Sequence, residues 1–207
     1  MAEKIALQLN YDEDKRAVIA YGLTAMIQMV TIFASITTIG LILHIWYECF
    51  IIYMSVGIIR KSTGGAHSKS MQGCIVVSVL SITGLSVISR YALGFEINVY
   101  ANLLILFLVF TIGFIVFYLR VPVDSPNKPI IKSEKIKRLR KQSFILLAVL
   151  FVISFILILL AVKNNRFYSL AFSIRLAMLW QVLTLTKTGI QLLGKVDAGI
   201  NAIFELG

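Results

Sequence analysis

A histidine and a cysteine lie seven residues apart in a stretch that is also rich in glycine and in cations. His67 falls in a loop, residues 60–73, and Cys74 follows that loop directly. A cysteine protease or acyl transferase needs a thiol, a base that takes its proton and a surface that stabilises an oxyanion. These residue types could supply all three, so we interpret the pair as candidate catalytic residues. The candidate supporting or substrate-binding residues of the same stretch are Arg60, Lys61, Gly64, Gly65, Lys69, Gln72 and Gly73.

The spacing limits how the two catalytic candidates could meet. On one continuous helix His67 and Cys74 would share a face but lie about 10 Å apart along the axis, too far for a hydrogen bond. The pair works only if two glycines, Gly64 and Gly65, bend the chain. His67 would then belong to a loop folded back over a helix that begins near Met71. In the first turn of that helix, free backbone N–H groups and the helix dipole would favour a thiolate.

The predicted helix has a suitable start and a polar side. Ser70 is a reasonable N-cap, and Gly73 would let a peptide backbone approach closely. Cys74 heads a stripe of serines at helical spacing, which is more typical of helix packing in membranes than of catalysis. The stripe consists of Ser78, Ser81 and Ser89.

The composition places this loop at a membrane. Of the 207 residues, 58% are hydrophobic and 14% are charged, and the mean hydropathy is +0.88, which excludes a disordered or ordinary soluble chain. The formal net charge of +10 needs no nucleic acid partner, because cytoplasmic loops of membrane proteins retain Lys and Arg. We therefore predict an all-α polytopic membrane protein with about six transmembrane or re-entrant helices, and with N-terminal and C-terminal interfacial helices.

Apolar runs set the predicted organisation of this single integral membrane domain. A helix needs about 20 apolar residues to cross roughly 30 Å of hydrocarbon. The run 44–59 would reach only about 24 Å, so it is a tight span or a re-entrant piece, and we count it as a span. The candidate spans are 18–43, 44–59, 74–94, 97–119, 143–162 and 167–186. The segments are an interfacial helix (1–17), two spans (18–59), the catalytic loop (60–73), two spans (74–119), a basic loop (120–141), two spans (143–186) and a C-terminal interfacial segment (187–207).

Loop charges predict the orientation. Residues 120–141 hold eight Lys and Arg against two acidic residues, which places this loop in the cytoplasm. The catalytic loop and both termini then fall on the cytoplasmic side. Lys163 and Arg166, between the last two spans, lie outside against the trend.

Other residues leave alternatives open. His44 and Cys49 form a competing pair, which we interpret as part of an interfacial belt with Trp46, Tyr47 and Glu48. A metal site is not expected, because two ligand-type residues in one loop cannot complete a coordination shell. We expect no other cofactor.

Two arginines suggest a different function. Arg90 and Arg175 fall in or near spans, where charge is costly and often functional, so a small transporter or channel subunit is the main alternative. Arg90 could instead snorkel to the outer interface, and Arg175 could pair with a carbonyl or hydroxyl in the bundle. A non-catalytic scaffold with an inert Cys74 is a second alternative.

The run GGAHSKS, with a cysteine seven residues after its histidine, resembles the accessory gene regulator B (AgrB) family of bacterial membrane peptidases. The likeness extends to the proline- and lysine-rich loop VPVDSPNKPIIKSEKIKRLRK and to the number of hydrophobic segments. It implies a multi-pass protein of the bacterial cell membrane that acts in Gram-positive quorum sensing, and it suggests a homodimer.

The same resemblance implies the reaction. The substrate would be a short precursor peptide with an amphipathic leader, a signal segment and an acidic tail. Cys74 would be the nucleophile that removes the tail, with His67 as its base, and a side chain of the peptide would close a cyclic thiolactone or lactone. Arg60 and Gly65 also match family positions important for activity. No Asp or Asn lies within the motif to orient His67, so a dyad is expected rather than a triad.

Overall fold

The protein is a bundle of long α-helices, seen in a computed structural model that describes residues 13–65, 70–92, 98–123 and 133–205. Apart from one isolated bridge between Gly64 and Val123, the described residues form no β-structure. The predicted all-α class is therefore confirmed. The helices are α2 (Glu13–Ile42), α3 (Trp46–Thr63), α4 (Met71–Val87), α5 (Val99–Arg120), α6 (Ser133–Ala161), α7 (Arg166–Leu185) and α8 (Lys187–Glu205), with a short π-helical segment, Ile88–Ala92, that continues α4.

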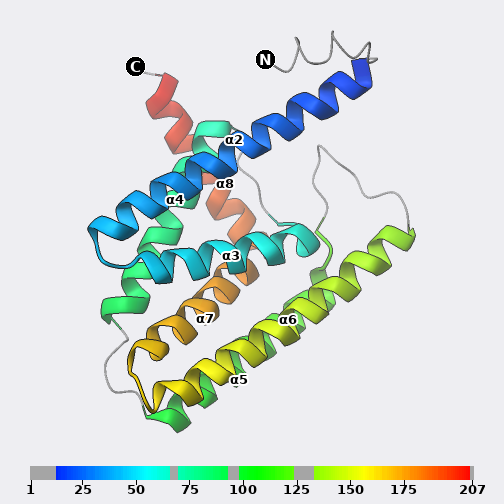
Figure 1. Cartoon of the computed structure of the whole chain (residues 1–207). Helices are drawn as coiled ribbons and strands as arrows, with labels where there is room; N and C mark the ends of the chain where they lie inside the picture. The colour runs from blue at the N-terminus through cyan, green and yellow to red at the C-terminus, as the bar shows by residue number, and fades with distance from the viewer. Residues whose placement is uncertain (1–12, 66–69, 93–97, 124–132, 206–207) are drawn as a thin grey trace.

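Five helices are long and apolar enough to cross a membrane, namely α2, α4 with its π-helical continuation, α5, α6 and α7. α3 lies beside them. Near its start Glu48 contacts Ser169, and at its end Thr63 contacts Gln181, so α3 runs parallel to α7 along its whole length (Figure 1). Its 18 residues cover about 27 Å. The segment predicted as a tight or re-entrant span, 44–59, thus lies mostly within one continuous helix that extends alongside α7.

α7 is the central helix of the bundle. Two thirds (67%) of its most apolar window is buried inside the protein, whereas the corresponding share for the other four helices is at most 33%. α3, α5 and α6 pack around it, and α8 and α4 also touch it. Because α7 faces protein rather than lipid, it tolerates the lowest mean hydropathy of the five, 1.3. Polar side chains on α7 can therefore serve interactions inside the bundle.

Two apolar clusters meet at α7. One joins α5, α6 and α7 around Phe117, Ile158 and Met178, and the ring of Phe110 packs edge-on against Phe151. The other joins α2, α3 and α4 and includes Ala177 of α7. Neighbouring residues on α7 thus bury themselves in opposite clusters, which fixes the rotation of this helix about its axis.

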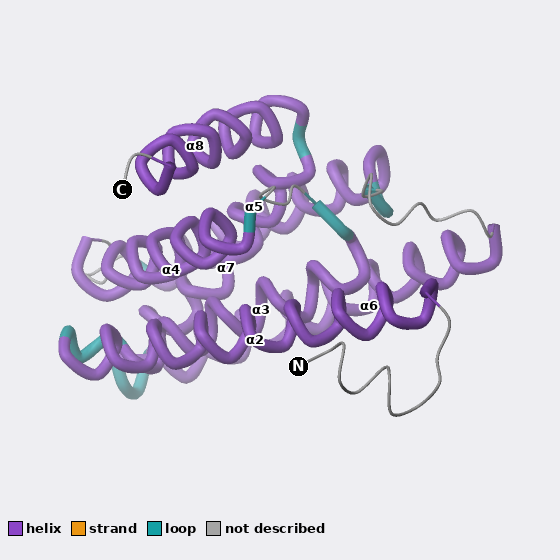
Figure 2. Tube along the Cα trace, turned by 90° about the horizontal axis from the view of Figure 1, so that it is seen from above, coloured by secondary structure: helices purple, strands orange, loops and turns teal. Residues whose placement is uncertain are grey.

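The ends of the chain differ in how much of them is described. α2 already begins at Glu13, so residues 13–17 of the expected interfacial helix belong to the first long helix, and residues 1–12 lie outside the described part. At the other end, the expected C-terminal segment corresponds to α8, which packs on α7 and α4 (Figure 2). Thr186 starts α8, because its hydroxyl accepts a hydrogen bond from the Gly189 N–H at 3.1 Å.

Candidate active site

Cys74 lies in the first turn of α4, as the sequence predicts. Ser70 is the N-cap: its backbone is extended, and its hydroxyl accepts a hydrogen bond from the Gly73 N–H at 3.0 Å. The Cys74 N–H donates to the Ser70 carbonyl at 3.1 Å. The predicted cap and helix start are confirmed. The cap also engages the N–H groups of Gly73 and Cys74, which leaves those of Met71 and Gln72 as the first-turn donors that an oxyanion could use.

Two glycines turn the chain at the end of α3. Gly64 has φ 72° and Gly65 has φ 131°, both in a region that side chains disfavour. A Cβ on Gly64 would collide with the Val123 carbonyl, and a Cβ on Gly65 would lie 3.0 Å from the Thr184 hydroxyl. The chain thus turns at the two glycines, as predicted, and glycine is favoured at both positions.

The turn joins the catalytic loop to the start of the basic loop. The Val123 N–H donates to the Thr63 carbonyl at 2.8 Å, and Gly64 bridges to Val123. The end of α3 and the segment after α5, which are far apart in the sequence, therefore lie side by side. The residues that follow them, 66–69 and 124–132, lie outside the described part of the chain, and His67 and Lys69 are among them.

Gln181 of α7 supports this turn. Its buried amide nitrogen donates to the Thr63 hydroxyl at 2.8 Å and to the Gly64 carbonyl at 2.9 Å. Its Oε1 is also buried and has no hydrogen-bond partner among the described residues. Thr184, one turn further along, lies against Gly65. Sequence reasoning missed both residues, although polar side chains inside an apolar span are a signal of interior contacts.

Four helices enclose a small cavity beside the cysteine. It measures about 40 Å³ and lies where α3, α4, α7 and α8 converge. Arg60 and Cys74 both line it. The cavity is lined by Arg60, Cys74, Val77, Ser78, Trp180, Thr184 and Leu193. A thiol, a cation and two hydroxyls thus face a space with apolar walls.

The remaining predicted residues divide into two groups. Lys61 and Gln72 are exposed and do not line this cavity. Lys61 follows Arg60, which lines it, and Gln72 precedes Gly73, whose N–H is bonded by the N-cap. Of the serine stripe, Ser78 lines the cavity, whereas Ser89 is buried and donates to the Ser169 carbonyl at 2.6 Å. The packing interpretation therefore holds for Ser89.

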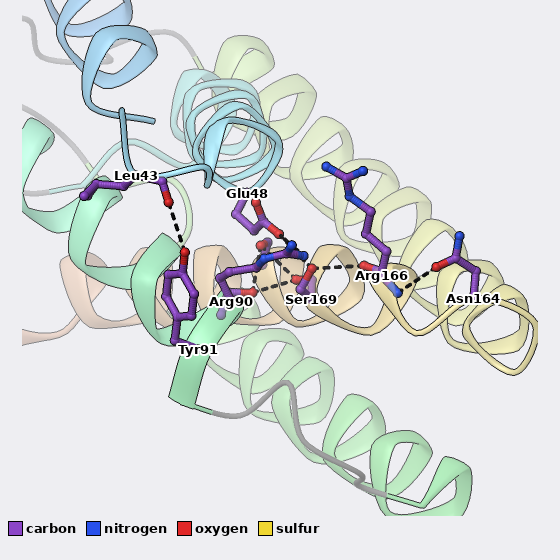
Figure 3. A network of polar contacts seen from close by, with 9 residues as sticks. Leu43, Glu48, Arg90, Tyr91, Asn164, Arg166 and Ser169 are labelled. Carbon is purple, nitrogen blue, oxygen red and sulfur yellow. Dashed lines mark hydrogen bonds and ion pairs between the residues drawn. The ribbon is translucent and has the colours of Figure 1, made fainter. Parts of the chain in front are cut away.

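The competing pair lies at the other end of α3. Cys49 is buried within the apolar cluster of α2, α3 and α4. Trp46 stacks on Phe50, as expected of an aromatic belt. Glu48, which we grouped with that belt, is instead buried: its carboxylate lies 3.6 Å from Arg90 and accepts a hydrogen bond from Ser169 at 2.8 Å (Figure 3). The helix face that carries Glu48 points at α7, and the ion pair with Arg90 compensates the buried negative charge of Glu48.

Arg175 is satisfied within the bundle. Its guanidinium donates to the carbonyl and the side-chain oxygen of Asn102, at 3.1 and 2.9 Å, and its Nε donates to the Ala171 carbonyl at 3.3 Å. The expected pairing with a carbonyl is confirmed. Because these contacts join α7 to α5, Arg175 has a structural part in the bundle.

The chain is similar to known proteins over nearly its whole length. Residues 1–185 match the family model described as Accessory gene regulator B. The chain is 31% identical over 207 residues to "Putative AgrB-like protein 2" of Clostridium perfringens strain 13, and 34% identical over 211 residues to "Putative AgrB-like protein" of strain SM101. Each alignment covers 98% of this chain and 96% of the relative. No solved structure matches the chain.

Proposed function

The chain belongs to the accessory gene regulator B family, and from this premise we propose that it is a membrane-embedded cysteine peptidase. It removes the C-terminal tail of a short signal-peptide precursor and promotes cyclisation of the remainder to a thiolactone or lactone. Cys74 is the nucleophile and His67 is its base. The end of the bundle that carries Cys74 faces the cytoplasm of the bacterial cell.

One observation carries this proposal: Cys74, in a capped first turn, shares a cavity with Arg60. A nucleophilic thiol needs an accessible sulfur and a nearby positive charge that balances the negative charge of the reaction. Cys74 is partly exposed, whereas Cys49 is buried among apolar side chains. Of the two cysteines, only Cys74 has the surroundings of a reactive group.

The proposed reaction proceeds through a thioester. The Cys74 thiol gives its proton to His67, and the sulfur bonds to the carbonyl carbon that precedes the tail. The C–N bond breaks, and the tail leaves as an amine with the proton from His67. A thiol or hydroxyl of the peptide then attacks the thioester, closes the ring and restores the Cys74 thiol. No oxidant or other co-reactant is required.

The surroundings of Cys74 favour ring closure over hydrolysis. Val77, Trp180 and Leu193 give the cavity apolar walls, and little space remains for water. A peptide bound there would hold its internal nucleophile close to the thioester, an advantage of several kcal/mol over free reactants. An acidic tail would be attracted to Arg60 and to the basic loop that begins beside Gly64.

Intact-mass spectrometry tests the proposal. The protein in liposomes is mixed with candidate precursor peptides from its own bacterium and quenched at intervals. We expect an acyl adduct on Cys74, a free tail and a dehydrated cyclic product, none of which should form with Cys74→Ala or His67→Ala. Cys49→Ala is the matched control and should keep activity, because Cys49 lies outside the cavity.

Two results would count against the peptidase. Product formation by an inserted Cys74→Ala variant would remove Cys74 from the reaction. Intact peptide and no adduct with the wild-type protein, across all candidate peptides, would favour the transport alternative at Arg90 and Arg175.

A further inference from the structure

A second and larger cavity lies at the opposite end of the bundle. It measures about 400 Å³ and opens between the turn that joins α2 to α3, the π-helical end of α4 and the start of α7. Its lining residues are His44, Arg90, Asn165, Arg166 and Ser169. Ser169 and Thr184 are separated by fifteen residues of α7, or about 22 Å along its axis. This cavity therefore shares no residue with the one at Cys74 and plays no part in the proposed peptidase reaction.

Positive charge dominates the cavity. Glu48 lies beneath it with 1% of its surface exposed, and its carboxylate is held by Arg90 and Ser169 (Figure 3). The guanidinium of Arg166 lies 4.5 Å from the centre of the Tyr47 ring. Within the described part of the chain, no carboxylate comes within ion-pair distance of Arg166. Glu48 is thus covered and balanced, whereas Arg166 is exposed, lines the cavity and has no counter-ion among those residues.

The walls of the cavity are fixed before any ligand arrives. His44 has φ 57°, a conformation that non-glycine residues seldom adopt, and the Ile45 N–H closes the turn by donating to Gly40 at 2.8 Å. The Tyr91 hydroxyl donates to the Leu43 carbonyl at 3.0 Å, which ties the segment carrying Arg90 to this turn (Figure 3). The turn that carries His44 and the segment that carries Arg90 are therefore held in place relative to one another, as a preorganised binding site requires.

The surroundings identify the ligand. Guanidinium groups match the geometry of phosphate oxygens, and 400 Å³ is large enough for a small polar headgroup. Beside the opening, Leu41 and Ile42 are 59% and 70% exposed, and Tyr47 is 49% exposed, so apolar surface adjoins the cations. We propose that this cavity binds the phosphate of an anionic phospholipid, with its acyl chains on the exposed side chains of the α2–α3 turn. A choline group finds no carboxylate among the described residues that line the cavity, which favours a lipid with a net negative charge.

Native mass spectrometry of the detergent-solubilised full chain tests this inference without an activity assay. Phosphatidylglycerol and phosphatidylcholine with the same acyl chains are titrated separately. We expect tighter binding of phosphatidylglycerol, weakened about tenfold by Arg166→Gln, which is the scale of one charge-assisted hydrogen bond. Arg166→Lys should restore part of the affinity. Lys163→Gln is the matched control: this lysine is exposed in the same turn but does not line the cavity, and its removal should change affinity by less than about twofold.

A second variant tests the contribution of Arg90. Arg90→Gln alone would leave Glu48 buried without its partner, so the double variant Glu48→Gln with Arg90→Gln is used, and it should also weaken phosphatidylglycerol binding. Equal binding of the two lipids, or unchanged binding by Arg166→Gln with normal helical content, would overturn the proposal. Displacement of phosphatidylglycerol by inorganic phosphate at equal concentration would show a free-anion site and would overturn the lipid assignment.

Discussion

Arg60 is the residue whose charge should matter most to the proposed reaction, because it lines the cavity that contains Cys74. We expect Arg60→Gln to lower the initial rate of tail release by about tenfold to a hundredfold, toward the effect of removing one group that stabilises an oxyanion. Arg60→Lys should recover part of that loss. Lys61→Gln is the control, since Lys61 is exposed and outside the cavity. Equal rates for Arg60→Gln and Lys61→Gln would contradict this role.

Gly64 and Gly65 make a second prediction at the scale of single residues. Alanine at either position should destabilise the turn by about 1–3 kcal/mol, because both have positive φ and neither has room for a Cβ. The midpoint temperature of thermal unfolding in detergent and the rate of tail release should both fall. Gly84→Ala, in the last turn of α4, has nothing within 4 Å of the new atom and should be neutral or slightly stabilising. A neutral Gly64→Ala would show that the turn differs from the one described.

At the scale of elements, Gln181 of α7 holds the turn at the end of α3 through hydrogen bonds to Thr63 and Gly64. Gln181→Leu removes two hydrogen bonds to the end of α3, so the loop that follows Gly65 should exchange its amide hydrogens faster and tail release should slow. The measurement is hydrogen exchange of residues 60–73 beside the activity assay. Gln191→Leu on the exposed surface of α8 is the matched control. Slower exchange or full activity in Gln181→Leu would show that this amide does not position the loop.

Local signals in the sequence were sufficient for some elements and not for others. The start of α4 could be predicted because a cap depends on residues three positions apart, and Ser70 contacts Gly73. The support from Gln181 could not, since this amide and Gly64 are 117 residues apart and only packing brings them together. Likewise, the short apolar run of α3 did not distinguish a crossing from a re-entrant helix. Its contacts with α7 show one continuous helix that lies beside α7.

Over the whole molecule, the two ends of the bundle differ, because each has a cavity with its own lining residues. The end with Cys74 carries the glycine turn and the start of the basic loop, where an acidic substrate would be attracted. The opposite end carries Arg166, one of the two cations that lie against the trend of the loop charges, and Arg166 lines one cavity there with Arg90 and His44. The position of a cation that binds a ligand or forms an ion pair is explained by that interaction and not by membrane topology. Such residues therefore weigh less in deciding orientation than the exposed lysines of a loop.

That argument predicts the orientation of the protein in the cell membrane. In a background of Cys49→Ala and Cys74→Ala, a cysteine at Lys163 should react with a membrane-impermeant maleimide in intact cells. A cysteine at Lys61 should react only after permeabilisation. Both side chains are exposed and lie at opposite ends of the bundle, so accessibility within the protein does not confound the comparison. The reverse pattern would place Cys74 outside and would exclude a cytoplasmic precursor peptide as its substrate, whereas the expected pattern puts the phospholipid cavity in the outer leaflet.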